Sequence, residues 1–342
     1  FPTRRSSDLL KPNPHQPRQE FDQEKLNELA DSIREHGVIE SIIIEDAGDG
    51  SFYFTASVPE YDRICLRHAQ TLAGLQEAEE VTIWRKHDSG IMSIHIWAPE
   101  LHYLAGSWYI YFAAGDRDDI WAIRPYVLKC EGQDPMKDPW NEVGLLKRAD
   151  DFCFNDFSLD MTVFEHRERM YAIWAEKVNQ GKKISNLYIA ELESPTVMKT
   201  AQVLLTTPDY DWERVDFWVN EGPAVLVTEK EIFVTYSASA TGACYAMGLL
   251  SIGAEEDLLD PRAWKKERVP VLATDEAVGL FGPGHNTFFT DAEGKVVTSY
   301  HARPYDEIVG DPLYDRNRHT YLMDVVMENG RPVFRYQNNR LN

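Results

Sequence analysis

The apolar and polar positions of this chain form a unit that recurs along most of its length. In each unit a strand pattern is followed by a turn of glycine or charged residues and then by an aromatic-rich strand that ends in small residues. Four copies lie at residues 96–114, 158–176, 220–239 and 282–303, and residues 49–57 contain the second half of a fifth copy. A period of about 60 residues with several strands in each unit predicts an all-β fold, a five-bladed β-propeller around a central channel.

The N-terminal part of the chain follows a different pattern. Residues 22–36 place leucine and isoleucine side chains on one face of a helix, which is expected to begin at Asp22 and to end at Gly37. The apolar residues 38–44 then indicate a short strand. The predicted architecture is therefore the propeller with a short N-terminal extension that contains a helix.

Composition and charge narrow the class of partner. Of the 342 residues, 43% are hydrophobic and 12% are aromatic, so the chain can bury a large core, and its nine tryptophans and sixteen tyrosines also suit a site that stacks on sugar rings. The formal net charge of -21 disfavours binding to nucleic acid or to anionic membranes and favours a neutral substrate. The four cysteines lack CxxC spacing and are expected to be core thiols, and no apolar run is long enough to span a membrane.

Candidate chemistry lies at corresponding places in the repeats. Pro99, Asp160, Glu221 and His285 lie about 60 residues apart, so the repeats are expected to gather them at one end of the channel. Two carboxylates across a narrow cavity can act as acid and base, and inverting glycosidases hold them roughly 6.5–9.5 Å apart with a water between them. For either carboxylate taken alone, the alternative is a solvated position on a loop.

The two parts of the chain resemble two different families. Residues 10–44, which contain "NPHQPR" and "HGVIESIII", resemble the amino-terminal segment of ParB-type chromosome-partitioning proteins. The arginine-rich nucleotide-binding motif and the helix-turn-helix domain of that family do not follow, so DNA partitioning is not expected. From about residue 50 to the C-terminus, "FTASVPEYDRI", "IWAPELH", "SLDMTVF", "VNEGPAVLV" and "FGPGHNTF" resemble glycoside hydrolase family 43, and most of all its exo-1,5-α-L-arabinofuranosidases.

The second resemblance implies a function and roles for individual residues. It implies an inverting glycosidase that removes terminal α-L-arabinofuranosyl units from arabinan or arabino-oligosaccharides and requires no cofactor. Glu221 in "NEGP" would be the general acid, and Asp160 in "SLDMT" would be the third carboxylate, which holds the pKa and orientation of the acid. His285 in "GPGHN" would lie beneath the pocket, where it could contact a structural calcium ion through water. A β-xylosidase, an endo-arabinanase and a non-catalytic arabinan-binding propeller remain alternatives.

Further aromatic and basic residues are candidates for sugar contact. Trp97, near the start of its repeat, could stack on a sugar ring, and burial in the core is an equal alternative. His301 and Arg303 could hydrogen-bond sugar hydroxyls, and a solvated salt bridge is the alternative for Arg303. Three tryptophans within strands are expected to pack in the core: Trp84, Trp108 and Trp174.

The general base of the family is missing from its expected place. Family members carry an aspartate in an "ADPxV"-like motif of the first blade, and counting back from "FYFTAS" puts the equivalent position at Ser41, beside Glu40. A serine hydroxyl is not a base at neutral pH, and Glu40 would point to the opposite face of the strand. Hydrolysis is therefore expected to be impaired, on the order of 10²–10⁴-fold.

A join between two unrelated sequences would explain this loss. The join is expected between Ile44 and Ser51, and residues 1–9, "FPTRRSSDL", look like a translated sequencing adapter, so a chimera is the simplest cause. The expected division is an adapter at residues 1–9, a partition-protein fragment at 10–44 and the propeller at 45–342. The expected partners are arabinan or its oligosaccharides, with no nucleic acid and no membrane.

Overall fold

The computed structural model describes residues 43–46, 50–178 and 184–340, and for residues 43–46 it describes the backbone alone. The predicted N-terminal helix, Glu40 and Ser41 lie outside these residues. The described residues form β-strands and four short 3₁₀ helices, which confirms the predicted all-β class. Among them, no helix combines the length and the apolar character that a bilayer span requires.

Most strands pair with their neighbours in sequence as antiparallel strands, in five groups. The first two groups have the orders β1-β2-β3-β4 and β5-β6-β7-β8. The strands of the first group are β1 (Ile43–Asp46), β2 (Phe52–Thr55), β3 (Arg63–Ala69) and β4 (Val81–Arg85). Those of the second group are β5 (Ile94–Leu104), β6 (Ser107–Asp116), β7 (Asp119–Cys130) and β8 (Trp140–Leu145).

The third and fourth groups join into one sheet of nine strands, because β11 and β14 pair in parallel. The third group contains β9 (Ser158–His166), β10 (Arg169–Val178), β11 (Ile184–Ser194), β12 (Val197–Met198) and β13 (Val203–Thr206). The fourth group contains β14 (Trp218–Val227), β15 (Glu231–Ala238), β16 (Ala246–Gly253) and β17 (Lys265–Lys266).

The fifth group has the order β18-β19-β20-β23, and β21 pairs with β22 in a separate hairpin. Its strands are β18 (Phe281–Thr290), β19 (Val296–Arg303), β20 (His319–Asp324) and β23 (Asn339–Arg340). The hairpin strands are β21 (Val326–Glu328) and β22 (Arg331–Val333). The 3₁₀ helices are η2 (Ala73–Leu75), η3 (Asp211–Glu213), η4 (Pro312–Tyr314) and η5 (Tyr336–Asn338).

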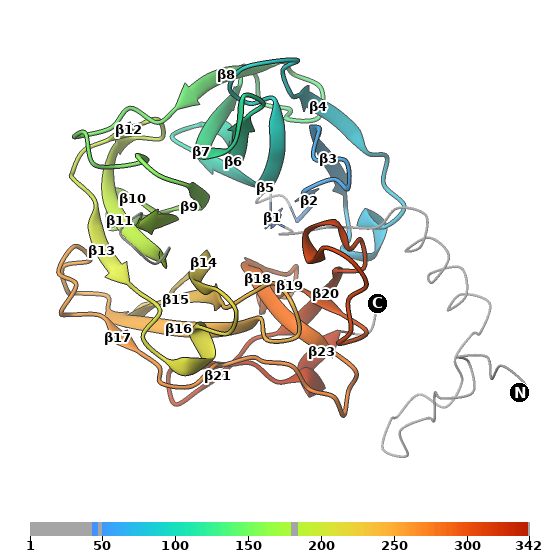
Figure 1. Cartoon of the computed structure of the whole chain (residues 1–342), viewed down its shortest axis with the longest axis vertical. Helices are drawn as coiled ribbons and strands as arrows, with labels where there is room; N and C mark the ends of the chain where they lie inside the picture. Colours follow the sequence, from blue (N-terminus) through green and yellow to red (C-terminus); the bar gives the residue numbers. More distant parts are fainter. Residues whose placement is uncertain (1–42, 47–49, 179–183, 341–342) are drawn as a thin grey trace, which may run out of the picture. The chain divides into compact units, whose positions relative to one another are not determined.

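The first strands of the five groups lie around a common centre. Each of β1, β5, β9, β14 and β18 contacts the first strands of its two neighbouring groups, and the groups follow one another about that centre in Figure 1. The second strands carry aromatic residues into the core, where Tyr111, Trp174 and Phe233 are fully buried. Since each such side chain removes about 150–250 Å² from water, these residues dominate core packing.

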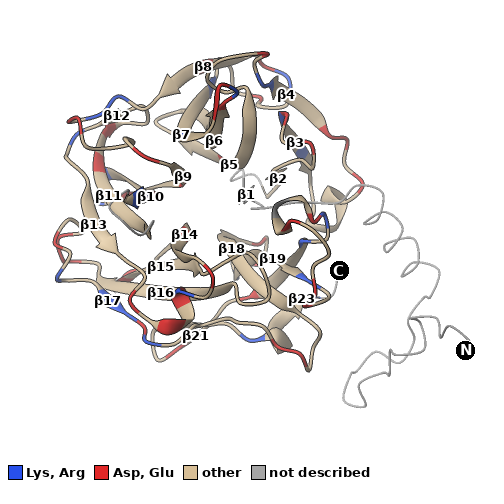
Figure 2. Cartoon of the chain, viewed as in Figure 1, with Lys and Arg blue, Asp and Glu red and all other residues tan. Residues whose placement is uncertain are grey.

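Charged residues lie mainly at the periphery of the strands, whereas most cysteines are buried. Asp and Glu residues lie largely on loops and strand ends, with Lys and Arg residues among them (Figure 2). Cys65, Cys130 and Cys153 are buried free thiols, as predicted, and Cys244 is partly exposed.

A β-bulge at a left-handed residue occurs in the first strand of four groups. These bulge residues are Ala98 on β5, Asp160 on β9, Gly222 on β14 and His285 on β18, with φ values of 46°, 54°, 54° and 46°, and β5 and β18 each contain a second left-handed residue, His95 and Gly282. Each lies where the pairing with the second strand shifts register. A bulge inserts one extra residue and re-aims the side chains beside it, and it is common next to active sites.

The equivalence predicted from spacing is wrong by one residue in two groups. Pro99 lies one residue after the left-handed position of its group, and Glu221 lies one residue before it. Adjacent residues of a strand point to opposite faces, so Glu221 and Asp160 do not occupy the same place in their groups. Spacing alone could not reveal this shift, because the repeats differ in length by about one residue.

Candidate active site

Three of the groups bring ionisable residues together at the starts of β9, β14 and β18. Asp160 Oδ2 accepts a hydrogen bond from the backbone N–H of Gly222 at 3.0 Å and lies 3.9 Å from Nδ1 of His285. Glu221 directly precedes Gly222. Asp160 and His285 are buried and Glu221 is partly exposed. The structure therefore gathers the predicted acid, the predicted third carboxylate and the predicted histidine in one region.

The backbone of this region is strained and closely packed. The left-handed conformation at Asp160 and at His285 costs about 1–3 kcal/mol for each residue. The backbone N–H of His285 donates a hydrogen bond to Ser237 Oγ at 2.7 Å. Gly222 lies so close to His285 that a Cβ at this position would be 2.9 Å from Cγ of the imidazole. Glycine is therefore required at position 222, and its contacts fix the backbone next to Glu221.

A tyrosine outside the repeat pattern holds the side chain of Glu221. Tyr245 OH donates a hydrogen bond to Glu221 Oε1 at 2.9 Å. Burial, and then the charges of Glu221 and Asp160, raise the pKa of Tyr245 well above its ordinary value, so its hydroxyl remains a donor at neutral pH. The repeat pattern does not point to Tyr245, because the residue lies in the connection between β15 and β16.

The side chain of His301 is buried beside Tyr245. The two rings stack with centroids 5.6 Å apart and an interplanar angle of 10°, and the His301 ring lies 6.5 Å from that of His285. Burial, and then the charge of Arg318, lower the pKa of His301 well below its ordinary value, so the imidazole is neutral at neutral pH. Within residues 50–178 and 184–340, neither ring nitrogen has a hydrogen-bond partner. A neutral imidazole can donate and accept, which suits the predicted contact with sugar hydroxyls.

The guanidinium group of Arg303 is engaged in contacts with other residues of the protein. Its guanidinium donates to the carbonyl oxygens of Thr241 at 2.6 Å and Pro312 at 3.2 Å, and its Nε lies 3.5 Å from Asp315 Oδ1. Burial is the first cause that lowers the pKa of Arg303, to about 10. The salt bridge that the sequence offered as an alternative is therefore present, but it is buried and not solvated. Contact of Arg303 with a sugar stays a prediction.

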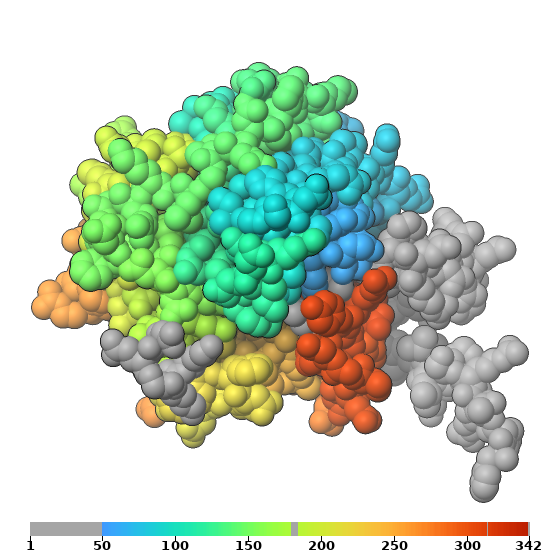
Figure 3. Space-filling view, turned by 45° about the horizontal axis from the view of Figure 1, so that its top comes forward, coloured from blue at the N-terminus to red at the C-terminus, as the bar shows by residue number. Residues whose placement is uncertain are grey.

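The connection that Arg303 secures runs from residue 304 to residue 318. In Figures 1 and 3 it is the red segment beside the blue residues of the first group. Tyr314 on this connection lies 6.3 Å from Tyr61, between ring centroids. The connection between β19 and β20 of the fifth group thus contacts the first group.

The side chain of Trp97 is buried in the protein core. Its side chain is 6% exposed and packs edge-on against Tyr61, with centroids 5.8 Å apart and an interplanar angle of 80°. Its ring also lies 4.4 Å from that of His95. This position fits the core alternative, and stacking of Trp97 on a sugar stays a prediction.

A fully buried carboxylate fixes the strand that carries Glu221. Glu213 is 0% exposed. It accepts hydrogen bonds from Asn220 Nδ2 at 3.0 Å, Tyr236 OH at 2.9 Å, the backbone N–H groups of Asp209 at 2.7 Å and Tyr210 at 2.8 Å, and Lys266 Nζ at 2.9 Å. Asn220 directly precedes Glu221, so this network restrains the backbone on one side of Glu221 while Gly222 restrains it on the other.

Glu213→Ala is expected to lower the free energy of unfolding by about 3–5 kcal/mol, because it breaks the ion pair with the partly buried Lys266 and leaves the side chains of Asn220 and Tyr236 without this acceptor. Urea unfolding followed by tryptophan fluorescence measures the change. Asp211→Ala is the matched control, since Asp211 is an exposed carboxylate of the same 3₁₀ helix, and a change within about 0.5 kcal/mol is expected there. A loss below about 1 kcal/mol for Glu213→Ala would contradict a stabilising network.

The residues around His285 do not fit a calcium ion that the protein itself chelates. Calcium prefers six to eight oxygen ligands, whereas His285 is an imidazole, and the Asp160 carboxylate near it already accepts a hydrogen bond from Gly222 through Oδ2. In the part of the chain that the structure describes, no group of three His, Cys, Asp or Glu residues could hold a metal ion. We therefore assign no catalytic step to a metal.

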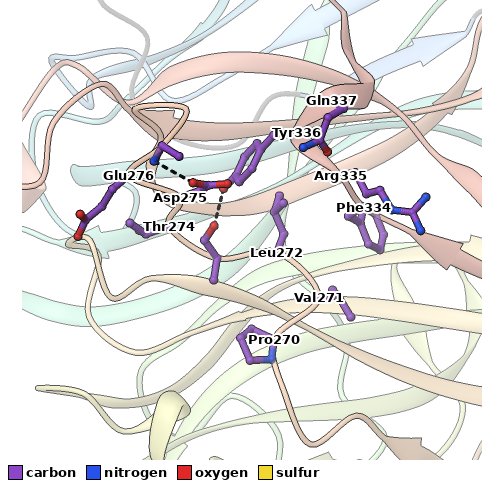
Figure 4. Close-up of a pocket in the computed structure, with 12 residues that line it drawn as sticks. Pro270, Val271, Leu272, Thr274, Asp275, Glu276, Phe334, Arg335, Tyr336 and Gln337 are labelled. Carbon is purple, nitrogen blue, oxygen red and sulfur yellow. Dashed lines mark hydrogen bonds between the residues drawn. The ribbon is translucent and has the colours of Figure 1, made fainter.

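An open groove lies elsewhere on the surface. It has a volume of about 610 Å³ and is lined by residues 270–277 and 334–337. Figure 4 shows Asp275 and Tyr336 at its wall. None of the three predicted ionisable residues lines this groove, so it is not part of the candidate active site.

Two families match the sequence. Glycosyl hydrolases family 43 matches residues 38–332, and the ParB N-terminal domain matches residues 6–57. The two matches overlap over residues 38–57.

Individual proteins match the two parts of the chain separately. The extracellular exo-alpha-(1->5)-L-arabinofuranosidase of Streptomyces avermitilis is 46% identical over 288 residues, which are 84% of this chain and 59% of that protein. The chain thus spans less than two thirds of the length of this curated relative. The crystal structure of alpha-L-arabinofuranosidase from Lactobacillus brevis is 46% identical, with a TM-score of 0.81 over 86% of this chain and 92% of that one. The chromosome-partitioning protein Spo0J of Thermus thermophilus is 42% identical over 72 residues, 21% of this chain and 24% of that protein.

Proposed function

The chain belongs to glycosyl hydrolases family 43, and we propose that residues 45–342 form a five-bladed β-propeller that removes terminal α-L-arabinofuranosyl units from arabinan or arabino-oligosaccharides with inversion. The observation that carries this proposal is the meeting of Asp160, Gly222 and His285, with Glu221 beside them. Identity of 46% with an exo-arabinofuranosidase supports the choice of sugar. Five antiparallel groups with adjacent first strands support the number of blades.

Glu221 is the proposed general acid. It would give its proton to the glycosidic oxygen as the bond from that oxygen to the anomeric carbon breaks. The hydrogen bond from Tyr245 restrains rotation of the carboxyl group. Asp160 accepts the N–H of Gly222 and so orients the peptide next to Glu221, which supports the orienting part of the role that the family resemblance gives to Asp160.

Two equivalent serines align the first group with the fourth, and this alignment gives the position that corresponds to the general base. Ser57 Oγ accepts a hydrogen bond from the backbone N–H of Ala98 at 2.8 Å, as Ser237 Oγ does from His285 at 2.7 Å. Each serine thus binds the left-handed residue of the next group. The two serines are therefore counterparts, and so are the threonines two residues before each of them.

The strand register then gives the count to the base position. Thr55 pairs with Ile43 on β1, and its counterpart on β15 pairs with Ala224 on β14. The left-handed residue Gly222 precedes Ala224 by two residues, and two residues before Ile43 is Ser41. This count makes Ser41 the counterpart of Gly222, and hence of Asp160, the left-handed residue of its own group. Counting back from "FYFTAS" reaches the same residue, which supports the proposal that Ser41 stands where the family has its base. It also favours a second candidate function, an arabinan-binding propeller with little or no turnover.

Cleavage of 1,5-arabino-oligosaccharides, followed as arabinose without azide and as arabinofuranosyl azide with azide, tests this function. We expect binding by calorimetry, weak hydrolysis and stimulation by azide. Azide would attack the anomeric carbon and form a glycosyl azide of inverted configuration, while the leaving oxygen takes its proton from Glu221, so no general base is needed. Turnover of about 1–10³ per second without azide would refute the missing base. Absence of binding to any arabinoside would refute the function itself.

The N-terminal part of the chain has a separate proposed origin. We propose that residues 1–9 derive from an adapter and that residues 10–44 are a partition-protein fragment joined to the hydrolase between Ile44 and Ser51. The overlap of the two family matches at residues 38–57 supports a join in this region. The net charge of -21 supports the absence of a nucleic-acid partner. DNA binding by the purified chain that weakens with salt would refute the proposed absence of a nucleic-acid partner.

No cofactor is required in the proposed reaction, because proton transfer and displacement at the anomeric carbon need only carboxyl groups and water. A calcium ion near His285 would have to be held largely by water, given the few oxygen ligands at this position.

A further inference from the structure

An exposed tryptophan near the proposed site is held flat against buried rings. Trp121 on β7 is 54% exposed, yet its ring stacks on His95 with centroids 5.3 Å apart and an interplanar angle of 20°. His95 is buried, and its ring lies 4.4 Å from that of Trp97. The three rings form a stack from the core beside the bulge of β5 to the surface. An apolar face that is exposed but already fixed loses little conformational entropy when a ligand covers it.

This stack opens at the end of the sheets where the first strands begin. Ile94, the first residue of β5, pairs with Gly115 near the end of β6, and a short turn into β7 follows. Trp121 therefore lies at the same end of its group as the bulge of β5. Its ring centroid is 6.5 Å from that of Phe157, which immediately precedes β9 and so lies three residues before Asp160.

We infer that Trp121 is a stacking platform for the sugar unit that follows the terminal arabinofuranose, on the leaving side of an arabino-oligosaccharide. This inference rests on the proposed function. If the terminal unit occupies the region of Asp160 and Glu221, the rest of the chain must extend from the protonated oxygen toward the surface at this end. Sugar rings present C–H faces to an aromatic plane, and such contact needs no charge, which suits a neutral polysaccharide.

A second exposed aromatic residue of the same sheet provides a matched control. Tyr103 is 46% exposed, and its ring also packs on a buried tryptophan, Trp108, with centroids 4.9 Å apart. It lies at the opposite end of β5, where Tyr103 pairs with Trp108 across the turn into β6. An effect of exposed aromatic area in general would appear at both residues, whereas a contact with the leaving sugar would appear at Trp121 alone.

Calorimetry of the full chain with methyl α-L-arabinofuranoside and with 1,5-arabinotriose tests the inference. Trp121→Ala should weaken binding of the trisaccharide on the order of tenfold and leave binding of the methyl glycoside unchanged. Trp121→Phe should retain most of the affinity for the trisaccharide, since it keeps an aromatic face. Tyr103→Ala should change neither affinity.

The outcomes separate this inference from the proposed function. If the parent chain binds the methyl glycoside and Trp121→Ala leaves the trisaccharide affinity unchanged, the platform is refuted and the proposed function stands. If Trp121→Ala weakens both ligands equally, Trp121 acts on the terminal unit or on folding, and the platform is again refuted. If the parent chain binds neither ligand, the proposed function is refuted, and this inference with it.

Discussion

Replacing Ser41 by aspartate is expected to raise the rate at which this chain hydrolyses an aryl α-L-arabinofuranoside by about 10²–10⁴-fold. An inverting glycosidase needs a carboxylate to take a proton from the attacking water. We propose Ser41 as the position of that carboxylate, by counting two residues back from Ile43, which pairs with Thr55. Because β1 also contacts β5 and β18, the strand that follows position 41 already lies among its neighbours. Initial rates of aryl alcohol release with the purified variant measure the gain.

Two further variants decide whether the gain comes from the carboxylate. Ser41→Asn has nearly the shape of aspartate but no basic oxygen, so its rate should stay at the level of the parent chain. Glu40→Gln should also leave the parent rate unchanged, because in the strand predicted from the sequence for residues 38–44 adjacent side chains point to opposite faces. A Ser41→Asp variant that hydrolyses no faster than Ser41→Asn would show that the base position lies elsewhere. Stimulation by azide should fall in Ser41→Asp, since water then competes effectively with the anion.

Most of the fold could be predicted from the periodicity of the sequence. The strand unit that recurs about every 60 residues corresponds to five successive antiparallel groups, and most small and aromatic residues of the second strands are buried. Trp84, Trp108 and Trp174 lie in the core, as expected of tryptophans within strands. Such positions can be predicted because a strand that is buried on both faces has a continuous run of apolar residues in the sequence.

The details of the candidate site could not be predicted to the residue. Glu221 lies one position away from the place that spacing suggested, because a period known only as about 60 residues does not fix which of two adjacent residues occupies the bulge. Tyr245 and Trp121 were not identified, since one lies in a connection between strands and the other near a hairpin turn. Arg303 could not be placed either, because its acceptors are carbonyl groups, which any sequence provides.

Both family resemblances are confirmed by the matches at residues 38–332 and 6–57. Motifs of several residues carried these resemblances, and a motif is informative where its residues are required by geometry. Gly222 is an example, because its left-handed backbone and its contact with His285 exclude a side chain. The predicted helix of the N-terminal part lies outside the described residues, so it stays a prediction.

Glu221→Gln is expected to lower azide-dependent cleavage of a 1,5-arabino-oligosaccharide by about 10²–10⁴-fold. Azide needs no general base, so this test is independent of Ser41. The leaving group is a sugar alcohol, which departs poorly without a proton, and glutamine cannot supply one. With 4-nitrophenyl α-L-arabinofuranoside the loss should be far smaller, because nitrophenolate leaves without protonation. Chromatography of released sugar and absorbance of nitrophenolate measure the two rates.

The contrast between the two substrates separates acid catalysis from a structural effect of the substitution. Tyr245→Phe removes the hydrogen bond to Glu221 Oε1 but keeps the acid, so it should slow the oligosaccharide less than Glu221→Gln does. A carboxyl group that merely stabilised the site would affect both substrates alike, since both place the same sugar among the same residues. An equal loss with the oligosaccharide and the nitrophenyl glycoside would therefore exclude Glu221 as the proton donor, whatever the size of that loss.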